Sequence, residues 1–225
     1  MTKNFIKRLL TSILLLVTLL IVIYSNRFIF GLSLLILGFI VCIEFNNIFR
    51  KLVGDLYSSS AKLIFKFFIL MWLPFVYMFF IFSFCVYEIY KLQGPTFLLF
   101  VISICFLSDI GGYVFGKIIG GKKLTKISPN KTISGSIGSF IFSIFSLIVF
   151  SNINNFKLDF NFDNLILCLS ISLICQLGDL FISLLKRKAK IKDTGKILPG
   201  HGGILDRVDG IIFALPFSYI LLRMI

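Results

Sequence analysis

The chain has 225 residues, of which 58% are hydrophobic and 15% are charged, and its mean hydropathy is +1.00. A soluble domain is typically about 45–50% apolar and about 25% charged. This composition, which includes 28 phenylalanines, excludes an ordinary soluble enzyme, a disordered segment and a fibrous repeat. It indicates an all-α, polytopic integral membrane protein.

Seven apolar runs lie along the chain, each near the roughly 20 residues that a helix needs to cross a hydrocarbon core. The first two are separated by three residues, which predicts a tight helical hairpin. The third contains Pro74, which kinks a membrane helix but is tolerated there, and its length leaves room for two shorter segments. We therefore predict about seven transmembrane helices, within a range of seven to nine. In chain order the runs are Leu9–Tyr24, Phe28–Ile43, Ile64–Tyr87, Thr96–Gly112, Ile133–Phe150, Leu165–Leu185 and Gly210–Met224.

The net charge of +13 comes from 23 lysines and arginines against 10 acidic residues. If the amino terminus is cytoplasmic, 19 of the 23 lie on cytoplasmic connections, and the other four are Arg27, Lys91, Lys157 and Arg223. This excess follows the positive-inside rule and favours an odd number of spans. Because orientation accounts for the charge, we expect no nucleic-acid partner. We predict a multi-pass protein of the cell inner (plasma) membrane, with its amino terminus and active site on the cytoplasmic side.

The same orientation divides the chain into two regions. We predict an N-terminal transmembrane region over 1–95 and a C-terminal catalytic transmembrane region over 96–225, whose cytoplasmic loops span 117–132 and 186–209. Each loop follows a helix that carries an aspartate near its cytoplasmic end. Chemistry is therefore expected in these two loops.

The two aspartates are Asp109 and Asp179, each inside an apolar run. An ionisable group within a span costs on the order of 2.5–3.5 kcal/mol and normally faces a cavity or a partner. Asp179, Ser183 and Lys186 are spaced i, i+4 and i+7, which places them on one helix face. A structural alternative is that each aspartate pairs with a nearby lysine.

A glycine-rich stretch, 116–121, is followed by lysines and leads through Ser128, Lys131 and Thr132 into the fifth apolar run. Backbone amides, hydroxyls and lysines at a helix start favour a phosphate-binding site. The stretch has no P-loop pattern, and a solvated loop held to anionic headgroups explains it as well.

The stretch from Ser183 to Asp209 carries the strongest signal. Asp206 and Asp209 are three residues apart, which predicts two carboxylates on one face at the start of the last helix. Without a thiolate or a second histidine nearby, paired carboxylates suit a hard ion such as Mg²⁺. Gly202 and Gly203 allow a ligand to approach the backbone closely. His201, the one histidine of the chain, is predicted to be functional, although a lone histidine is usually structural.

This stretch resembles the signature of the CDP-diacylglycerol synthase (phosphatidate cytidylyltransferase) family, S-x-x-K-R-x4-K-D-x-G-x2-L-P-x-H-G-G-x-x-D-R-x-D, at every defined position. The upstream family motif, S-P-K-K-T-x-E-G, matches in part. Here Asn130 and Ser134 replace a lysine and a glutamate, and Phe106 stands where the family often has tryptophan. The resemblance covers the chain from about Asp109 onward.

The resemblance implies an enzyme that joins CTP to phosphatidate, giving CDP-diacylglycerol and pyrophosphate. It implies Mg²⁺ as cofactor, with room for a second cation such as K⁺. The implied partners are CTP, phosphatidate and membrane lipid, and a homodimer is compatible with the family.

The resemblance also assigns residues. Mg²⁺ would be held by Asp179, Asp206 and Asp209. The residues expected to take part in catalysis are Asp179, Asp206, Asp209, Lys186, Arg187 and His201, of which His201 would bind phosphate or move a proton. The expected substrate-binding residues are Asp109, Ser128, Lys131, Thr132, Ser183, Lys192, Asp193, Gly202, Gly203 and Arg207.

Other functions fit the sequence less well. A transporter would explain the intramembrane aspartates but not the loop around His201. A CDP-alcohol phosphotransferase is excluded, because Asp209-Gly210 is followed by Ile-Ile-Phe-Ala-Leu instead of that family's motif. Another membrane lipid transferase, a polyprenol-type kinase or a non-catalytic relative stays open.

Overall fold

A computed structural model describes residues 3–53, 69, 71–125, 128, 131–153, 158–200 and 202–224. Throughout these residues the fold is helical, and β-structure is limited to two isolated bridges, Lys123–Thr132 and Leu198–Gly202. The all-α prediction is thereby confirmed. Five described helical stretches are long and apolar enough to cross a membrane: Ile6–Ile23, Arg27–Leu52, Met71–Ile118, Ile133–Ser151 and Phe162–Lys188.

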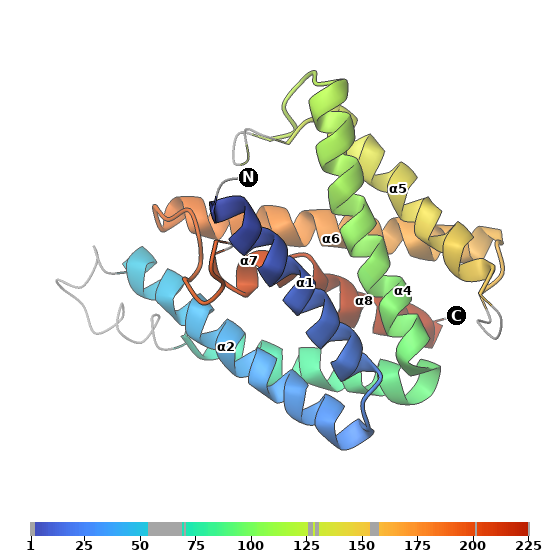
Figure 1. Cartoon of the computed structure of the whole chain (residues 1–225), viewed down its shortest axis with the longest axis horizontal. Helices are drawn as coiled ribbons and strands as arrows, with labels where there is room; N and C mark the ends of the chain where they lie inside the picture. The colour runs from blue at the N-terminus through green and yellow to red at the C-terminus, as the bar shows by residue number, and fades with distance from the viewer. Residues whose placement is uncertain are drawn as a thin grey trace. The chain divides into compact units, whose positions relative to one another are not determined.

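The number of spans stays a prediction. Met71–Ile118 is 48 residues long and covers the described part of the third and the fourth predicted runs. Its second part, α4 (Ser83–Ile118), is interrupted at Gly94, whose φ of 80° is not helical and which precedes Pro95. Figure 1 shows the change of direction in α4. The last helix, α8 (Ile211–Met224), has 14 residues, fewer than a straight span needs.

The chain forms two compact units. The first comprises Met1–Tyr87 and Leu185–Val208, and the second comprises Glu88–Leu184 and Asp209–Ile225. Helices α4 and α6 (Phe162–Lys188) each contribute to both units. The predicted functional regions 1–95 and 96–225 stay predictions.

The first unit contains the predicted hairpin, α1 (Lys3–Ile23) and α2 (Arg27–Val53) (Figure 1). The Asn26 side chain accepts a hydrogen bond from the Ile29 amide (2.8 Å), which caps the start of α2. Leu10, Leu14 and Ile21 of α1 are more than 60% exposed, as expected of a helix that faces lipid. The π-helix η2 (Tyr77–Phe82) and the short α7 (Leu205–Val208) complete the unit.

Helix α2 continues ten residues beyond the predicted end of its span at Ile43. The apolar run ends there because Glu44 follows. Glu44 is nevertheless helical and only 1% exposed. The predicted end of the second helix at Ile43 is therefore wrong. The helix continues because the Glu44 side chain is buried within the protein and does not end the buried face.

In the second unit, α4 and α5 (Ile133–Ser151) approach closely through glycines. A Cβ at Gly138 would lie 2.7 Å from the Gly111 carbonyl oxygen and would also collide with Phe115. Ser139 donates a hydrogen bond to the Ser108 carbonyl (2.7 Å) across the same contact. Small residues that admit such contact are typical of helix packing in membranes.

We expect Gly138→Ala to destabilise the second unit by about 1–3 kcal/mol, because the added methyl overpacks the α4–α5 contact. A lower unfolding midpoint in detergent would show this. Gly31→Ala is the matched control, since a Cβ there meets its nearest atom, on Tyr87, at 3.7 Å. Equal midpoints for the two variants would contradict the packing role of Gly138.

Candidate functional site

The described residues of the predicted loop up to Val208 belong to the first unit. Helix α6 ends at Lys188, and Lys190 follows with a φ of 54°. Further along, Leu198 and Gly202 exchange backbone hydrogen bonds of 2.9 and 3.2 Å. Gly200 and Gly202 have φ values of 78° and 92°, a region that side chains disfavour. Gly200 and Gly202 therefore permit this turn, and of the two only Gly202 stands at a defined position of the signature.

The buried carboxyl group of Glu44, on α2, binds the inner side of this loop. It accepts hydrogen bonds from the Thr194 hydroxyl (2.8 Å), the Ile204 amide (3.0 Å) and the Leu205 amide (2.8 Å). A Cβ at Gly203 would collide with both Glu44 and Thr194. Glu44 was not predicted as a site residue. The available signal was a carboxylate inside an apolar helix, which normally has a partner.

The carboxyl group of Asp206, on α7, also binds this loop. Its Oδ1 accepts a hydrogen bond from the Lys186 amine at 2.8 Å. Its Oδ2 accepts three more, from the Thr194 amide (2.8 Å), the Gly203 amide (3.0 Å) and the Thr194 hydroxyl (3.1 Å). Burial alone would raise the pKa of the Asp206 carboxyl, but these bonds hold that pKa below its ordinary value of 3.8. Glu44 and Asp206 together fix the loop backbone on either side of the glycines.

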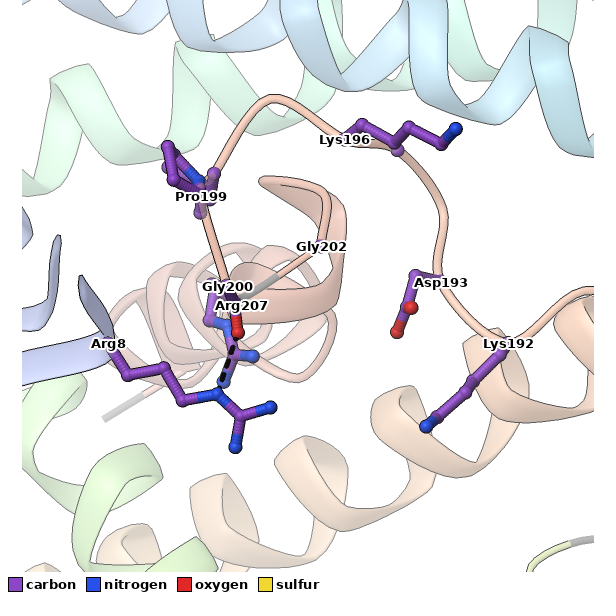
Figure 2. Close-up of a pocket in the computed structure, with 10 residues that line it drawn as sticks. Arg8, Lys192, Asp193, Lys196, Pro199, Gly200, Gly202 and Arg207 are labelled. Carbon is purple, nitrogen blue, oxygen red and sulfur yellow. Dashed lines mark hydrogen bonds between the residues drawn. The ribbon is translucent and has the colours of Figure 1, made fainter. Parts of the chain in front are cut away.

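A cavity of about 630 Å³ opens beside the loop. In Figure 2 the side chains of Arg8, Lys192 and Asp193 point into one opening, whereas the Lys196 amine points away. Arg8 comes from α1, and its Nε donates a 3.0 Å hydrogen bond to the Gly200 carbonyl. The lining residues are Arg8, Lys192, Asp193, Gly195, Lys196, Leu198, Pro199, Gly200, Gly202 and Arg207. Four cations against one carboxylate make the cavity a site for an anion.

The second unit holds the intramembrane aspartates. Asp179, on α6, forms an ion pair with Lys131 and accepts a 3.3 Å hydrogen bond from Ser183, one helical turn further along. The Asp109 carboxyl interacts electrostatically with both Asp179 and Lys131. The predicted shared face of Asp179 and Ser183 is confirmed. The structural alternative of a lysine partner also holds for Asp179.

The predicted phosphate-binding loop forms the start of α5. Thr132 caps the helix by accepting a 3.0 Å hydrogen bond from the Gly135 amide, and the Ile133 amide donates to the Lys122 carbonyl at 3.0 Å. The Ser134 hydroxyl, at a position where the family motif has glutamate, donates to the Gly120 carbonyl. Two of the first amides of α5 are therefore already bonded within the protein.

The predicted metal ligands are divided between the units. Asp206 belongs to the first unit, and Asp179 and Asp209 belong to the second, so their convergence on one ion stays a prediction. The described residues contain no group of three or more His, Cys, Asp or Glu side chains arranged to hold a metal. His201 lies outside the described residues, and Arg187 is exposed at the end of α6.

The prediction that Asp206 and Asp209 begin the last helix is wrong. Asp206 lies in the separate turn α7, and α8 begins at Ile211. The Gly210 amide donates to the Asp209 side chain at 3.0 Å. A Cβ at Gly210 would also collide with Cys175 of α6. The helix is interrupted at Asp209 and Gly210, where this close contact and the side-chain bond lie.

Comparisons with known proteins identify the family of this chain. Three similar proteins are each named phosphatidate cytidylyltransferase: 45% identity over 134 residues in Staphylococcus haemolyticus, 39% over 132 in Bacillus subtilis and 46% over 134 in Staphylococcus aureus. Each match covers 58% of this chain and 49–50% of the relative, so the chain spans about half the length of the curated relatives it matches. The profile of the cytidylyltransferase family matches residues 5–225. The chain is therefore a multi-pass membrane protein that belongs to the cytidylyltransferase family.

Proposed function

We propose that the protein transfers a cytidylyl group from CTP to phosphatidate, giving CDP-diacylglycerol and pyrophosphate, in keeping with the names of its relatives. The observation that supports this most directly is the ordered signature loop with its cationic cavity. A lipid substrate requires an active site at a membrane, and an anionic nucleotide requires cations beside it. We place the site at the cytoplasmic face, in keeping with the positive-inside pattern.

The proposed step is an in-line displacement. A phosphate oxygen of phosphatidate attacks the α-phosphorus of CTP, a P–O bond forms, and the bond to the bridging oxygen breaks so that pyrophosphate leaves. Because a phosphate monoester is largely ionised near neutral pH, the step needs no general base. The main demands are positioning and the neutralisation of negative charge.

The residues of each unit suit a part of this demand. Lys192 and Arg207 line the cavity of the first unit and would contact phosphate groups. In the second unit, Lys131 and Thr132 stand at the start of α5, where we expect the nucleotide to bind. Ser128 and His201 keep their predicted roles as proposals.

We propose that Mg²⁺ assists the reaction. The second unit contains side-chain oxygens that could bind a metal, on Asp109, Asp179 and Ser183. The Asp209 backbone lies next to Gly178, the residue before Asp179. One or two carboxylates together with substrate phosphates are a usual Mg²⁺ environment. Asp206 fits less well, because a metal would have to displace donors that it already binds. When bound, Mg²⁺ would neutralise charge on the nucleotide phosphates.

The defining experiment uses the full chain purified in detergent with Mg²⁺, phosphatidate and CTP labelled in its cytidine or in its γ-phosphate. The proposal requires cytidine label in the lipid product and γ-label in pyrophosphate. Transfer of the γ-label to lipid would identify a kinase instead. No transfer of either label, under conditions where the Bacillus subtilis relative is active, would indicate a non-catalytic relative.

We expect Asp179→Asn to lower kcat at least tenfold and to raise the Mg²⁺ concentration for half-maximal rate, because a ligand charge is lost. Chelation should abolish activity in both proteins, and added Mg²⁺ should restore it. Asp163→Asn, exposed in the first turn of the same helix, is the control. An unchanged Mg²⁺ requirement would remove Asp179 from the metal site.

A further inference from the structure

We propose that Arg8, on the first helix, is a substrate-binding residue that contacts a phosphate group together with Lys192 and Arg207 in the loop cavity. The proposal rests on the proposed function in one respect: that function names the nucleotide and the lipid as the two molecules whose phosphate could bind here. Arg8 would thus add a cation from the amino-terminal part of the chain to the signature loop. In sequence, Arg8 is 192 residues away from Gly200, which it contacts.

The contact with Gly200 fixes the position of the Arg8 guanidinium. Nε donates to the Gly200 carbonyl at 3.0 Å, and a Cβ added at Gly200 would lie 3.2 Å from Arg8 Cγ. Within the described part of the chain, Arg8 has no carboxylate partner and no second side-chain hydrogen bond. Its terminal N–H groups point into the opening (Figure 2) and have no acceptor among the residues that the structure describes. The planar fork of arginine matches two oxygens of a phosphate.

The charge and size of the cavity select the class of ligand. The lining includes four cationic residues, Arg8, Lys192, Lys196 and Arg207, and one carboxylate, Asp193. The Lys196 amine points away from the opening, which leaves three cations for a ligand. This excess of positive charge attracts anions. It suits a ligand with several charged oxygens better than one with a single carboxylate. A volume of about 630 Å³ lies within the range of small-molecule sites, about 300–1,000 Å³. A phosphate-bearing group of a nucleotide or of a lipid headgroup satisfies both conditions.

The positive-inside pattern alone does not explain Arg8. That pattern requires a cation near the end of a span but no particular contact. Arg27, at the opposite end of the same hairpin, is also exposed and lines no described part of the cavity. Arg27→Ala is therefore a matched control for removing one arginine from the α1–α2 hairpin.

The experiment compares wild type, Arg8→Gln, Arg8→Lys and Arg27→Ala as full-length proteins in mixed micelles. Arg8→Gln removes the charge while keeping a hydrogen-bond donor, and Arg8→Lys keeps the charge without the fork. The measured quantities are the KM for CTP, the KM for phosphatidate and the inhibition constant of pyrophosphate. Loss of one charge-assisted contact should change at least one of these about tenfold in Arg8→Gln, with a smaller change in Arg8→Lys.

The pattern of change identifies the source of the phosphate. Parallel rises in the KM for CTP and the pyrophosphate inhibition constant would assign Arg8 to the nucleotide, and a rise in the KM for phosphatidate alone would assign it to the lipid. The proposal is overturned if all three constants stay within twofold of wild type. It is also overturned if only kcat and the unfolding midpoint fall, since Arg8 would then merely tether the loop.

A binding measurement separates this proposal from the proposed function. Pyrophosphate should raise the unfolding midpoint of the wild-type protein and of Arg27→Ala. It should raise the midpoint of Arg8→Gln much less. This result would support an anion site that includes Arg8 even in a protein that transfers no cytidylyl group. Equal stabilisation of all variants by pyrophosphate, together with a KM for phosphatidate in Arg8→Gln within twofold of wild type, would overturn the Arg8 proposal and leave the proposed function standing.

Discussion

Replacement of Glu44 by alanine should reduce activity more than a hundredfold and release the signature loop from its fixed conformation. Glu44 accepts hydrogen bonds from Thr194, Ile204 and Leu205, and it is 1% exposed. Each buried donor left without an acceptor costs about 1–3 kcal/mol. The Ile204 and Leu205 amides would lose their acceptor, whereas the Thr194 hydroxyl keeps its bond to Asp206. Two stranded amides are enough to make the observed loop conformation unfavourable, although Glu44 itself touches no substrate in the proposed mechanism.

Glu44→Gln provides a graded version of the same test. One glutamine oxygen can still accept a bond, but the amide nitrogen would face a backbone N–H group, so at least one bond is lost. We expect a loss of about tenfold, between wild type and Glu44→Ala. Glu88→Gln is the control, because Glu88 forms only long ion pairs, of 3.7 and 3.9 Å, with partly exposed partners.

Limited trypsin digestion supplies a readout apart from activity. The loop carries Lys192 and Lys196, and release of its backbone should speed cleavage there in Glu44→Ala more than in Glu44→Gln. Cleavage at the wild-type rate in both variants, together with normal activity, would show that the Glu44 bonds do not hold the loop.

Asp206→Asn should produce the second large effect, a loss of about 3–5 kcal/mol in stability together with most of the activity. Asp206 and Lys186 form an ion pair whose side chains are 7% and 15% exposed. Removal of one partner leaves the other charge buried without compensation. The double variant Lys186→Met/Asp206→Asn should recover part of the lost stability, since it removes the stranded ammonium group.

The pH dependence of this effect follows from the direction of the pKa shift. The pKa of Asp206 is lower in the folded protein than its ordinary value of 3.8. Its contribution to stability is therefore fully present above about pH 4 and is lost as the pH falls through the folded-state pKa. The difference in unfolding midpoint between wild type and Asp206→Asn should stay constant from pH 5 to 8 and shrink below pH 4. Asp159→Asn, exposed and outside the helices, should show no such difference.

The same variant distinguishes a loop anchor from a metal ligand. If Asp206 anchors the loop, Asp206→Asn lowers the unfolding midpoint in the presence of chelator and leaves the Mg²⁺ concentration for half-maximal rate unchanged. A tenfold rise in that concentration, with normal stability in chelator, would instead support the metal role that the sequence assigns to Asp206.

Features set by local periodicity were predictable from the sequence. The fifth run, predicted as Ile133–Phe150, is observed as Ile133–Ser151, because an apolar stretch after a capping threonine determines both ends. The hairpin of the first two runs was predictable for the same reason. In the loop, the close approach of a ligand was predicted at Gly202 and Gly203, whereas a Cβ at Gly203 would meet Glu44 and Thr194 of the protein itself. The break at Asp209 and Gly210 was not predicted, since the three-residue spacing of Asp206 and Asp209 indicated a single helix face.

Contacts between distant parts of the chain were not predictable in this way. Arg8 counted only as a positive charge near a span, and Glu44 only as the end of an apolar run. Their partners lie 192 and 150–161 residues away. No periodic pattern in one segment specifies such a partner, so the amino-terminal contribution to the loop appears only in the folded structure.

The long separation between Glu44 and its donors affects how the protein is made. Helix α2 enters the membrane early in synthesis, whereas Thr194 is added 150 residues later. At about 5–20 residues per second, roughly 8–30 seconds pass before the ribosome supplies the first of these donors. During that interval the nascent chain holds an acidic group within its spans that nothing yet satisfies. The carboxy-terminal part of the chain is therefore what supplies Glu44 with these partners, and a copy that ends before Thr194 lacks them.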